Sequence, residues 1–500
     1  MGAFSYPSGG GAAAAGGSAY THILTQKTVG GVTTYAAYDA KGNPVPGASN
    51  TTPDATPILR TLFQTAINTG QGVDIVVTPG SYQLTDRDGW HQDPNNSGWL
   101  YMVYVPLAGT LASTMSISIT GLTGGGGGEV YTYFSLAGMG GHALNNVGVQ
   151  FITNFASTTL AGVNANSVFG CLKSPTNFAG LNYVGVQLNN LRFTQQTNQW
   201  SSQNNWSSMI DGRGLSGLSG VGQLVIDTQT TDSSVMTQAD SQNNIGLYMP
   251  SGSNQGLCHL DQVNVSGYGI GVYLSDHADI DYLYCQACTD AIQIGNASHL
   301  AHIGHFNPQQ CKYYIALQYY VNALVIDILD PEPQTSGFQN SANNWQEFAG
   351  LFDNTGYPFM GEVNINYGPI EGNGAGAEFP SLNSPSLGTM PAQSYTNNGT
   401  NYYSSYTLHF IGDPVNIIAG TVSGTAAWNM PLMGSNNKKV TVNLSAFQST
   451  SKIITFPVPF INTPTIITDA SGGATVSTTT LTLPDTHLLA KTGLISVEGS

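Results

Sequence analysis

The sequence has 500 residues, of which 41% are apolar and only 8% are Asp, Glu, Lys or Arg, and its formal net charge is −16. Enough apolar surface is available for a core, which excludes a disordered chain. Its 12 Lys and Arg residues cannot neutralise a run of phosphates, so we expect neither a nucleic-acid partner nor binding to membranes. The 61 glycines, with many Asn, Ser and Thr residues, indicate an all-β chain of short strands and tight turns.

The N-terminal 50 residues are low-complexity and rich in turn formers, and they predict an arm with at most short strands. They contain no basic segment followed by a long apolar one, so we expect no signal peptide. A helix follows, with Thr56 as N-cap, Pro57 at its first position and Gly70 as its stop. Its apolar stripe comprises Ile58, Leu59, Leu62, Phe63, Ala66 and Ile67.

The segment VDIVVTPGSYQL, residues 73–84, predicts a strand that stops at Pro-Gly and resumes at Tyr82. Downstream, the pattern apolar-x-x-apolar-x-apolar recurs as LNNVGV, LNNLRF, VGQLVI, LDQVNV, IDYLYC, LAHIGH, ALVIDI and MGEVNI. Its middle copies begin at Leu260, Ile280 and Leu300, twenty residues apart, and Val272 maps onto Ile292 at the same spacing. A fixed period of this size indicates stacked units that share one core. We therefore predict a right-handed parallel β-helix.

The helix and the strand after it resemble the start of the pectate-lyase-like superfamily. The matching residues are Asp54, Ala55, Ile58, Phe63, Ala66, Val73, Val76, Pro79, Gly80 and Tyr82. The resemblance covers roughly residues 50–380 and implies a β-helix whose open end is covered by the helix. The family holds lyases, glycoside hydrolases, epimerases and viral tailspikes, so the resemblance is more specific for fold than for activity.

The last hundred residues lack the twenty-residue register. The segment KIITFPVPFINTPTIIT, residues 452–468, resembles the β-sandwich at the tips of phage tail fibres, as does the final LISVEG. Such tips trimerise the fibre or bind a receptor. The predicted organisation is an arm or attachment segment at 1–50, a β-helix at 51–380, a linker at 381–400 and a C-terminal β-sandwich at 401–500.

The chain has five cysteines, and this odd number argues against a framework in which all cysteines form disulfides. Cys285 and Cys288 form a CxxC motif, and His299, His302 and His305 follow it. On strands, residues three apart point to opposite faces, which argues against a zinc site. We expect buried or stacked side chains here, with no metal and no cofactor.

Asp261 and Asp281 occupy equivalent places on successive coils, so their Cα atoms should lie about 4.8 Å apart. At least one of their pKa values should rise unless a neighbouring group compensates. We expect His302 one coil further on, beside Tyr282. These three residues are the candidate catalytic set, because glycosidases use one protonated and one ionised acid. Two other readings stay open, namely Asp side chains that accept backbone hydrogen bonds at the corners and cation binding.

Four aromatic residues are candidate stacking platforms for sugar rings: Trp200, Trp206, Tyr282 and Tyr284. Aromatic packing against a neighbouring subunit would explain them equally well. No complete polygalacturonase motif set is present, and the clustered Arg or Lys of a pectate-lyase site is missing.

The sequence favours a phage or prophage tailspike-like protein that binds and depolymerises a host surface polysaccharide, as a glycoside hydrolase or a lyase. We expect a homotrimer, located in the virion or outside the cell, which contacts other tail proteins through residues 1–50. The alternative is a non-enzymatic adhesion or structural fibre on the same scaffold, in which Asp261 and Asp281 serve only as corner residues.

Overall fold

The computed structural model describes twenty-five segments of the chain, and every structural statement below refers to them. They are residues 20–69, 72–92, 99–105, 115–122, 148–154, 165–171, 184–196, 207–215, 217–229, 244–249, 258–274, 277–295, 300–309, 311–318, 321–330, 350–354, 359–367, 394–397, 400–403, 407–410, 428–433, 437–443, 453–455, 462–484 and 494–499. These segments contain one helix and 34 strands, which confirms the all-β class. Among them, no helix is long and apolar enough to cross a membrane.

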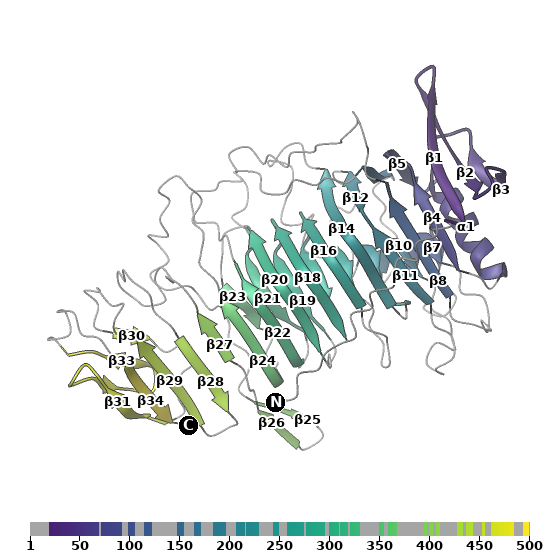
Figure 1. Ribbon diagram of the computed structural model, residues 1–500. Coiled ribbons are helices and arrows are strands. Elements are labelled where there is room, and N and C mark those ends of the chain that lie inside the picture. Colours follow the sequence, from purple (N-terminus) through teal and green to yellow (C-terminus); the bar gives the residue numbers. More distant parts are fainter. Residues whose placement is uncertain are drawn as a thin grey trace, which may run out of the picture.

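Two long rows of parallel strands form the elongated body (Figure 1). The first row pairs in this order: β5 (Gly80–Thr85), β9 (Val149–Asn154), β12 (Leu191–Gln196), β14 (Gly217–Gln229), β16 (Cys258–Ser266), β18 (Ala278–Gln286), β20 (Ala301–Gln309), β22 (Val321–Leu329) and β24 (Phe359–Tyr367). At one end it is joined through β14 to the parallel strands β4 (Val73–Val77), β8 (Met115–Gly121) and β11 (Val184–Asn189).

The second row runs beside the first. Its strands are β7 (Trp99–Val105), β10 (Ala165–Cys171), β13 (Ser207–Asp211), β15 (Asn244–Tyr248), β17 (Ile270–Leu274), β19 (Asp290–Ile294), β21 (Tyr313–Leu317) and β23 (Gly350–Asn354), with β6 (His91–Gln92) antiparallel to β7. From β15 to β24, consecutive strands alternate between the two rows. Each circuit of the chain therefore adds one strand to each row.

Apolar side chains stack in register between neighbouring strands and form one core. Tyr82 faces Phe151, which faces Phe193, with ring centroids 5.7 and 5.3 Å apart. The column continues through Ile226 and Val265, and all five side chains are buried. Full burial of one such side chain contributes roughly 1.5–3 kcal/mol. In-register stacking is therefore a major stabilising term.

The predicted twenty-residue period holds for part of the stack. Leu260 pairs with Ile280 and Val272 with Ile292, which confirms the register between these coils. The next step is twenty-three residues, because Ile280 pairs with Ile303, so the placement of Leu300 in this column was wrong. Two other positions predicted for the core are exposed: Val221 (67%) and Ile328 (47%). Register shifts at these points of β14 and between β22 and β24 turn both side chains outward.

The helix α1 (Thr56–Thr69) lies beside β4 and β7 at one end of the stack (Figure 1). All six predicted stripe residues are buried. The helix starts earlier than predicted, because the Ala55 carbonyl accepts its first backbone hydrogen bond, from Leu59. The Asp54 carboxylate accepts the Thr56 N–H at 3.0 Å and the Thr85 hydroxyl at 2.6 Å. These bonds attach the start of the helix to β5.

The segment VDIVVTPGSYQL forms β4 and β5 with the predicted break at Pro-Gly. Gly80 has φ +147°, and a Cβ at this position would meet the side chain of Gln26. Tyr82 is buried, and its hydroxyl donates to the Thr78 carbonyl at 2.9 Å. The break between β4 and β5 therefore depends on the glycine at position 80 and on the hydrogen bond of the Tyr82 hydroxyl.

Residues 22–50 contain longer strands than the sequence analysis expected. The antiparallel strands β1 (His22–Val29), β2 (Val32–Asp39) and β3 (Pro44–Asn50) pair in that order. The strand β1 also pairs in parallel with β4, which connects this segment to the body. The hairpin formed by β1 and β2 projects beyond the end of the body (Figure 1).

Pairing becomes antiparallel in the C-terminal part. Strand β27 (Thr407–Phe410) still pairs in parallel with β24, and β28 (Trp428–Met433), β29 (Asn437–Asn443), β34 (Leu494–Gly499) and β31 (Thr465–Asp469) follow it in an antiparallel sheet. A smaller sheet contains β30 (Ile453–Thr455), β33 (Thr480–Thr482) and β32 (Thr475–Val476). The hairpin β25 (Ser394–Asn397) and β26 (Thr400–Tyr403) begins within the expected linker. Packing of these sheets as a sandwich stays a prediction.

Asp290 is a buried acid in the second row whose pKa is raised. Asp290 on β19 is 7% exposed, and its Oδ1 atom has no hydrogen-bond partner among the described residues. Burial, followed by the nearby charge of Asp353, raises its pKa to about 7, while Lys312 opposes the shift. The folded chain therefore holds a proton on Asp290 that the unfolded chain releases near pH 4.

We expect Phe151→Ala to lower the free energy of unfolding by about 3–5 kcal/mol, because it leaves a cavity between two stacked rings. The exposed Val221 provides a control, since Val221→Ala should change stability by no more than about 0.5 kcal/mol. Guanidinium unfolding measures both variants. Similar losses in the free energy of unfolding of both variants would contradict the burial of Phe151 and the exposure of Val221.

We expect Asp290→Asn to become more stable relative to the natural chain as the pH rises from 4 to 7. In that window the natural chain loses stability, because its folded state binds a proton that its unfolded state does not. The difference should reach about 4 kcal/mol and stay constant above pH 7. Unfolding at pH 4, 6 and 8 measures it, with Asp74→Asn, which removes an exposed carboxylate, as control. A difference in stability that does not change with pH would contradict a protonated Asp290 in the folded chain.

Candidate functional site

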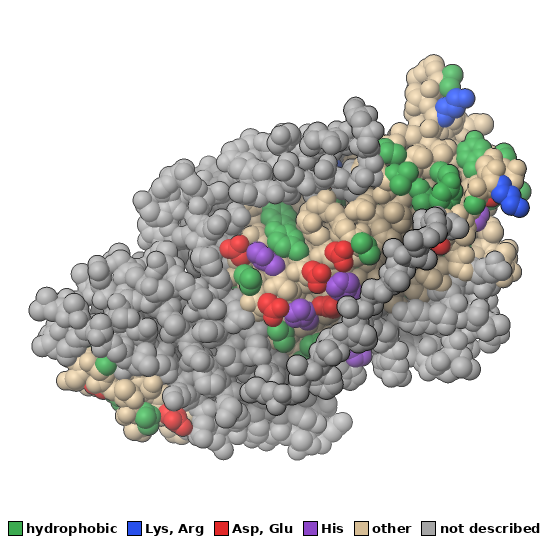
Figure 2. Space-filling model, in the orientation of Figure 1, with side chains coloured by type: hydrophobic (Ala, Val, Ile, Leu, Met, Phe, Trp, Pro, Cys, Tyr) green, Lys and Arg blue, Asp and Glu red, His purple; other side chains and the backbone are tan. Residues whose placement is uncertain are grey.

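Six titratable side chains gather on the outer face of the first row, at β16, β18, β20 and β22. We call them the Asp–His cluster: His259, Asp261, Asp279, Asp281, His302 and Asp327. On β16 and β18 they alternate with buried residues, as strand geometry requires. Acidic and histidine side chains are visible together on this face in Figure 2.

Contacts between neighbouring strands connect the cluster. His259 pairs in register with Asp279, and Asp279 with His302. His259 Nδ1 lies 2.9 Å from one oxygen of Asp279, and His302 Nδ1 lies 2.7 Å from the other. His302 Nε2 lies 3.0 Å from an Asp327 oxygen. Carboxylates and imidazoles therefore alternate across four neighbouring strands.

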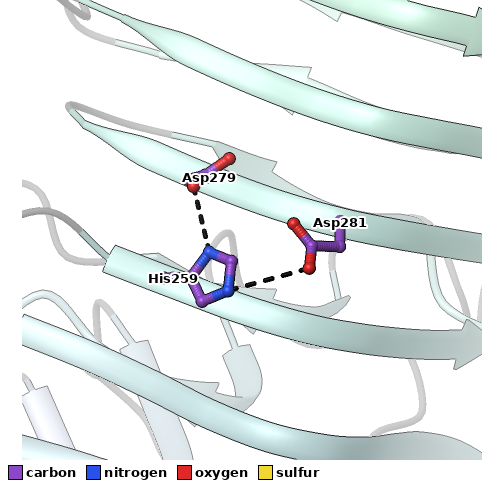
Figure 3. Close-up of side chains that lie close together, drawn as sticks. All are labelled: His259, Asp279 and Asp281. Atoms are coloured by element: carbon purple, nitrogen blue, oxygen red, sulfur yellow. Dashed lines mark hydrogen bonds and ion pairs between the residues drawn. The ribbon is translucent and has the colours of Figure 1, made fainter. Parts of the chain in front are cut away.

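The second nitrogen of His259 faces two further carboxylates. Its Nε2 atom lies 3.3 Å from Asp261 Oδ1 and 3.8 Å from Asp281 Oδ2. Figure 3 shows His259 between Asp279 and Asp281, with a different ring nitrogen directed to each. The other oxygen of Asp261 accepts the Gly222 N–H at 2.9 Å. Asp281, in contrast, has an exposed side chain (61%).

The nearby carboxylates raise the pKa of both imidazoles. The hydrogen bond with Asp279, assisted by Asp327, raises the pKa of His302 to about 9 against the opposing effect of burial. Burial lowers the pKa of His259, but the hydrogen bond with Asp279 and the charges of the three nearby aspartates outweigh it and raise the pKa. The hydrogen bond with His302 is the main reason why the pKa of Asp279 is lowered. Asp279 and the two imidazoles thus stabilise one another's charged forms.

The structure brings the three predicted catalytic residues together, with one correction. Asp261 and Asp281 lie at equivalent places, because their neighbours pair as Leu260 with Ile280 and Gln262 with Tyr282. His259 Nε2 lies within 4 Å of a carboxylate oxygen of each of these two residues. His302 lies opposite Asp279 rather than beside Tyr282, because the step to β20 has three extra residues. His305 takes the place beside Tyr282, with the two rings 5.0 Å apart.

The predicted stacking residues are not assembled into one platform by the described contacts. Tyr282 is partly exposed, but Tyr284 is 5% exposed and its hydroxyl donates to Gln309. Trp200, Trp206 and His299 lie outside the described residues. Four of the five cysteines are buried free thiols, as expected, and the side chain of Cys171 is not described.

Sequence reasoning missed the roles of His259 and Asp279. Asp279 lies within β18 and His259 within β16, and neither was among the candidate site residues. The signal was present, because the two residues immediately precede Leu260 and Ile280 and therefore share the same twenty-residue column.

The arrangement suits proton transfer and cation binding. Its imidazoles, when protonated, can donate protons, and Asp281 and Asp327 have exposed carboxylates (61% and 56%) that can accept hydrogen bonds. Ligand atoms of His259, Asp279 and Asp281 lie within 4.8 Å of one another, a spacing that a divalent cation can bridge.

We expect His302→Gln to remove a stabilising term that depends on pH. Because the folded pKa of about 9 exceeds the ordinary 6.5, this term is present below pH 6.5 and lost as the pH rises through 9. The difference in stability between the natural chain and the variant should therefore shrink between pH 6 and 10. Asp327→Asn, which removes one of the two partners, should show a smaller effect. A difference that is constant with pH would contradict the described contacts.

Comparisons with known proteins complete the description of the site. No family model, curated protein or solved structure matches the chain. The functional conclusion therefore depends on the strand topology and on the geometry of the Asp–His cluster.

Proposed function

We propose that this chain is a right-handed parallel β-helix of the pectate-lyase-like superfamily, of the tailspike type, which binds a host surface polysaccharide and cleaves it at the Asp–His cluster. The alternation of β15 to β24 between two parallel rows supports the coiled fold. The position of α1 at the end of the stack supports its role as the cap.

One observation carries the functional part of the proposal. In a chain with only 8% charged residues, six titratable side chains from four neighbouring strands meet on one outer face. Titratable groups that perturb one another on an accessible surface are typical of functional sites. A polysaccharide is a suitable substrate, because an elongated sheet face can contact several sugar units.

The chemistry that fits this face is hydrolysis. A protonated imidazole of His259 or His302 can donate a proton to the departing glycosidic oxygen. The exposed carboxylate of Asp281 accepts a proton from the water whose oxygen attacks the sugar carbon. Elimination is less well supported, because residues 258–330 contain one Lys or Arg, namely Lys312, to neutralise a uronate.

A second candidate, a non-enzymatic adhesion or structural fibre, is favoured by one contact. The Gly222 N–H donates to Asp261, which is the bond expected of a corner residue. The same Asp–His contacts would then only hold neighbouring coils together. Asp281 argues against a purely structural role, because among the described residues its carboxylate forms one ion pair, with His259 at 3.8 Å, and is 61% exposed.

The proposal includes assembly and location. We propose a homotrimer in the virion or outside the cell, attached to other tail proteins through residues 1–50. The C-terminal antiparallel sheets are the candidate trimerisation or receptor-binding part. Light scattering of the purified chain tests the trimer, and a monomer would remove that part of the proposal.

We expect the natural chain to release new reducing ends from at least one bacterial exopolysaccharide in a panel of neutral and weakly acidic polymers. Asp281→Asn should lower the rate at least about 100-fold, since general acid–base catalysis contributes about 10²–10⁴-fold. The control Asp74→Asn removes an exposed carboxylate from β4 and should retain full activity.

Saturable binding of a polymer without any release of ends would favour the adhesion fibre. Full activity in Asp281→Asn would show that the cleavage site lies elsewhere.

A further inference from the structure

Three buried thiols belong to the same core and have no part in the proposed function. They are Cys285 on β18, Cys288 in the corner between β18 and β19, and Cys311 in the corner between β20 and β21. Two thiols in contact can be oxidised to a disulfide. The spacing of these three side chains therefore decides which covalent bond they can form.

Cys288 and Cys311 lie opposite each other on successive circuits of the chain. On one side of this pair, the Ala287 N–H donates to the Gln309 carbonyl at 3.1 Å, and on the other the Lys312 N–H donates to the Cys288 carbonyl at 3.1 Å. Backbones joined in this way lie about 4.8 Å apart. This separation is inside the range of about 4.4–6.8 Å that a disulfide requires between its two Cα atoms.

The two thiols also contact each other. The Cys311 thiol forms a hydrogen bond with the side chain of Cys288, and both residues are buried. The sulfurs must come closer to form a covalent bond, and rotation of each side chain about its Cα–Cβ bond brings them together. The two backbones can therefore keep their places when the bond forms.

Loss of the two thiol hydrogens removes only weak contacts. The carbonyls of Gln286 and Gln309 accept from Cys288 and Cys311 at 3.4 and 3.5 Å, and each also accepts a backbone N–H, at 3.0 and 3.1 Å. The Cys285 carbonyl is a further acceptor for Cys311 at 3.4 Å. Because a thiol is a weak donor, the covalent bond outweighs these contacts.

The other described cysteines lack a cysteine at the neighbouring position. Cys285 lies opposite Pro308 on the next strand, and its thiol donates to the Ala291 carbonyl at 3.3 Å. Cys258 lies opposite Ala278. The spacing of the CxxC motif alone would suggest a bond within one circuit, whereas the register favours a bond between two circuits.

We propose that Cys288 and Cys311 form a disulfide when the folded chain meets hydrogen peroxide, and that this bond joins two successive circuits of the chain. One thiol is oxidised to a sulfenic acid with release of one water, and the second thiol displaces the hydroxyl as another water. Two S–H bonds break, one S–S bond forms, and the peroxide is reduced to two waters.

The disulfide fixes the step on which the Asp–His cluster depends. Cys288 and Cys311 are twenty-three residues apart, which is the step that places His302 opposite Asp279. A covalent bond at this step prevents β20 from slipping along β18. The inference does not depend on the proposed function, because a chain that binds no polysaccharide still holds both thiols.

The test is incubation of the reduced full-length chain with hydrogen peroxide, followed by thiol titration in denaturant and by mass spectrometry of proteolytic peptides. We expect the five thiols of the chain to fall by two, with one linked peptide pair that contains Cys288 and Cys311. Dithiothreitol should restore all five. Cys311→Ser should abolish the link, and the matched control Cys258→Ser, which alters another buried thiol, should retain it.

Stability provides a second readout. The oxidised natural chain should unfold at a higher guanidinium concentration than the reduced chain, because the disulfide closes a loop in the unfolded state. The same treatment of Cys311→Ser should not raise the unfolding midpoint.

Retention of all five thiols after the peroxide, or a link between Cys285 and Cys288, would overturn the proposal. So would a loss of two thiols in Cys311→Ser equal to that in the natural chain. The peptide map of the natural chain decides the question even if a variant does not fold.

Discussion

In-register stacking of apolar side chains from one parallel strand to the next is the constraint on which the rest of the structure depends. The column through Tyr82, Phe151 and Phe193 fixes which residue of each strand faces inward. Because side chains alternate along a strand, the same register also fixes what faces outward. A slip of one residue would expose the core and bury the polar face. The register of the strands thus determines both which side chains pack in the core and which lie on the outer surface.

The Asp–His cluster is a direct result of that constraint. Backbone pairing of β16, β18 and β20 brings His259, Asp279 and His302 to successive positions at strand spacing. Like charges in such a column would repel, but here carboxylate and imidazole alternate. Each charged group stabilises the charged form of its neighbour, which is why the pKa of His302 rises while that of Asp279 falls. The Asp–His cluster therefore gathers several titratable side chains in a chain in which only 8% of the residues are Asp, Glu, Lys or Arg.

Composition and local patterns were sufficient to predict the all-β class, the helix that begins near Thr56 and the equivalent places of Asp261 and Asp281. These features depend on local apolar patterns that a single sequence displays. The register across β18 and β20 could not be obtained in this way, because it depends on the number of residues between β19 and β20. Extra residues in a turn leave the apolar pattern of both flanking strands unchanged. The pattern alone therefore cannot reveal that Leu300 lies outside its expected column.

The number of residues between β19 and β20 decides which side chains meet on the outer face. With a twenty-residue step, Asp279 would face His299, and His302 would lie beside Tyr282. The step of twenty-three places His302 opposite Asp279 and moves His305 to the position beside Tyr282. His302 can then contact both Asp279 and Asp327, which extends the Asp–His contacts to β22. It also leaves Gly304 next to Asp281, where a larger side chain would meet the backbone of Asp281. A side chain at position 304 would therefore have to displace the backbone of Asp281, and the proposed hydrolysis depends on the exposed carboxylate of this residue.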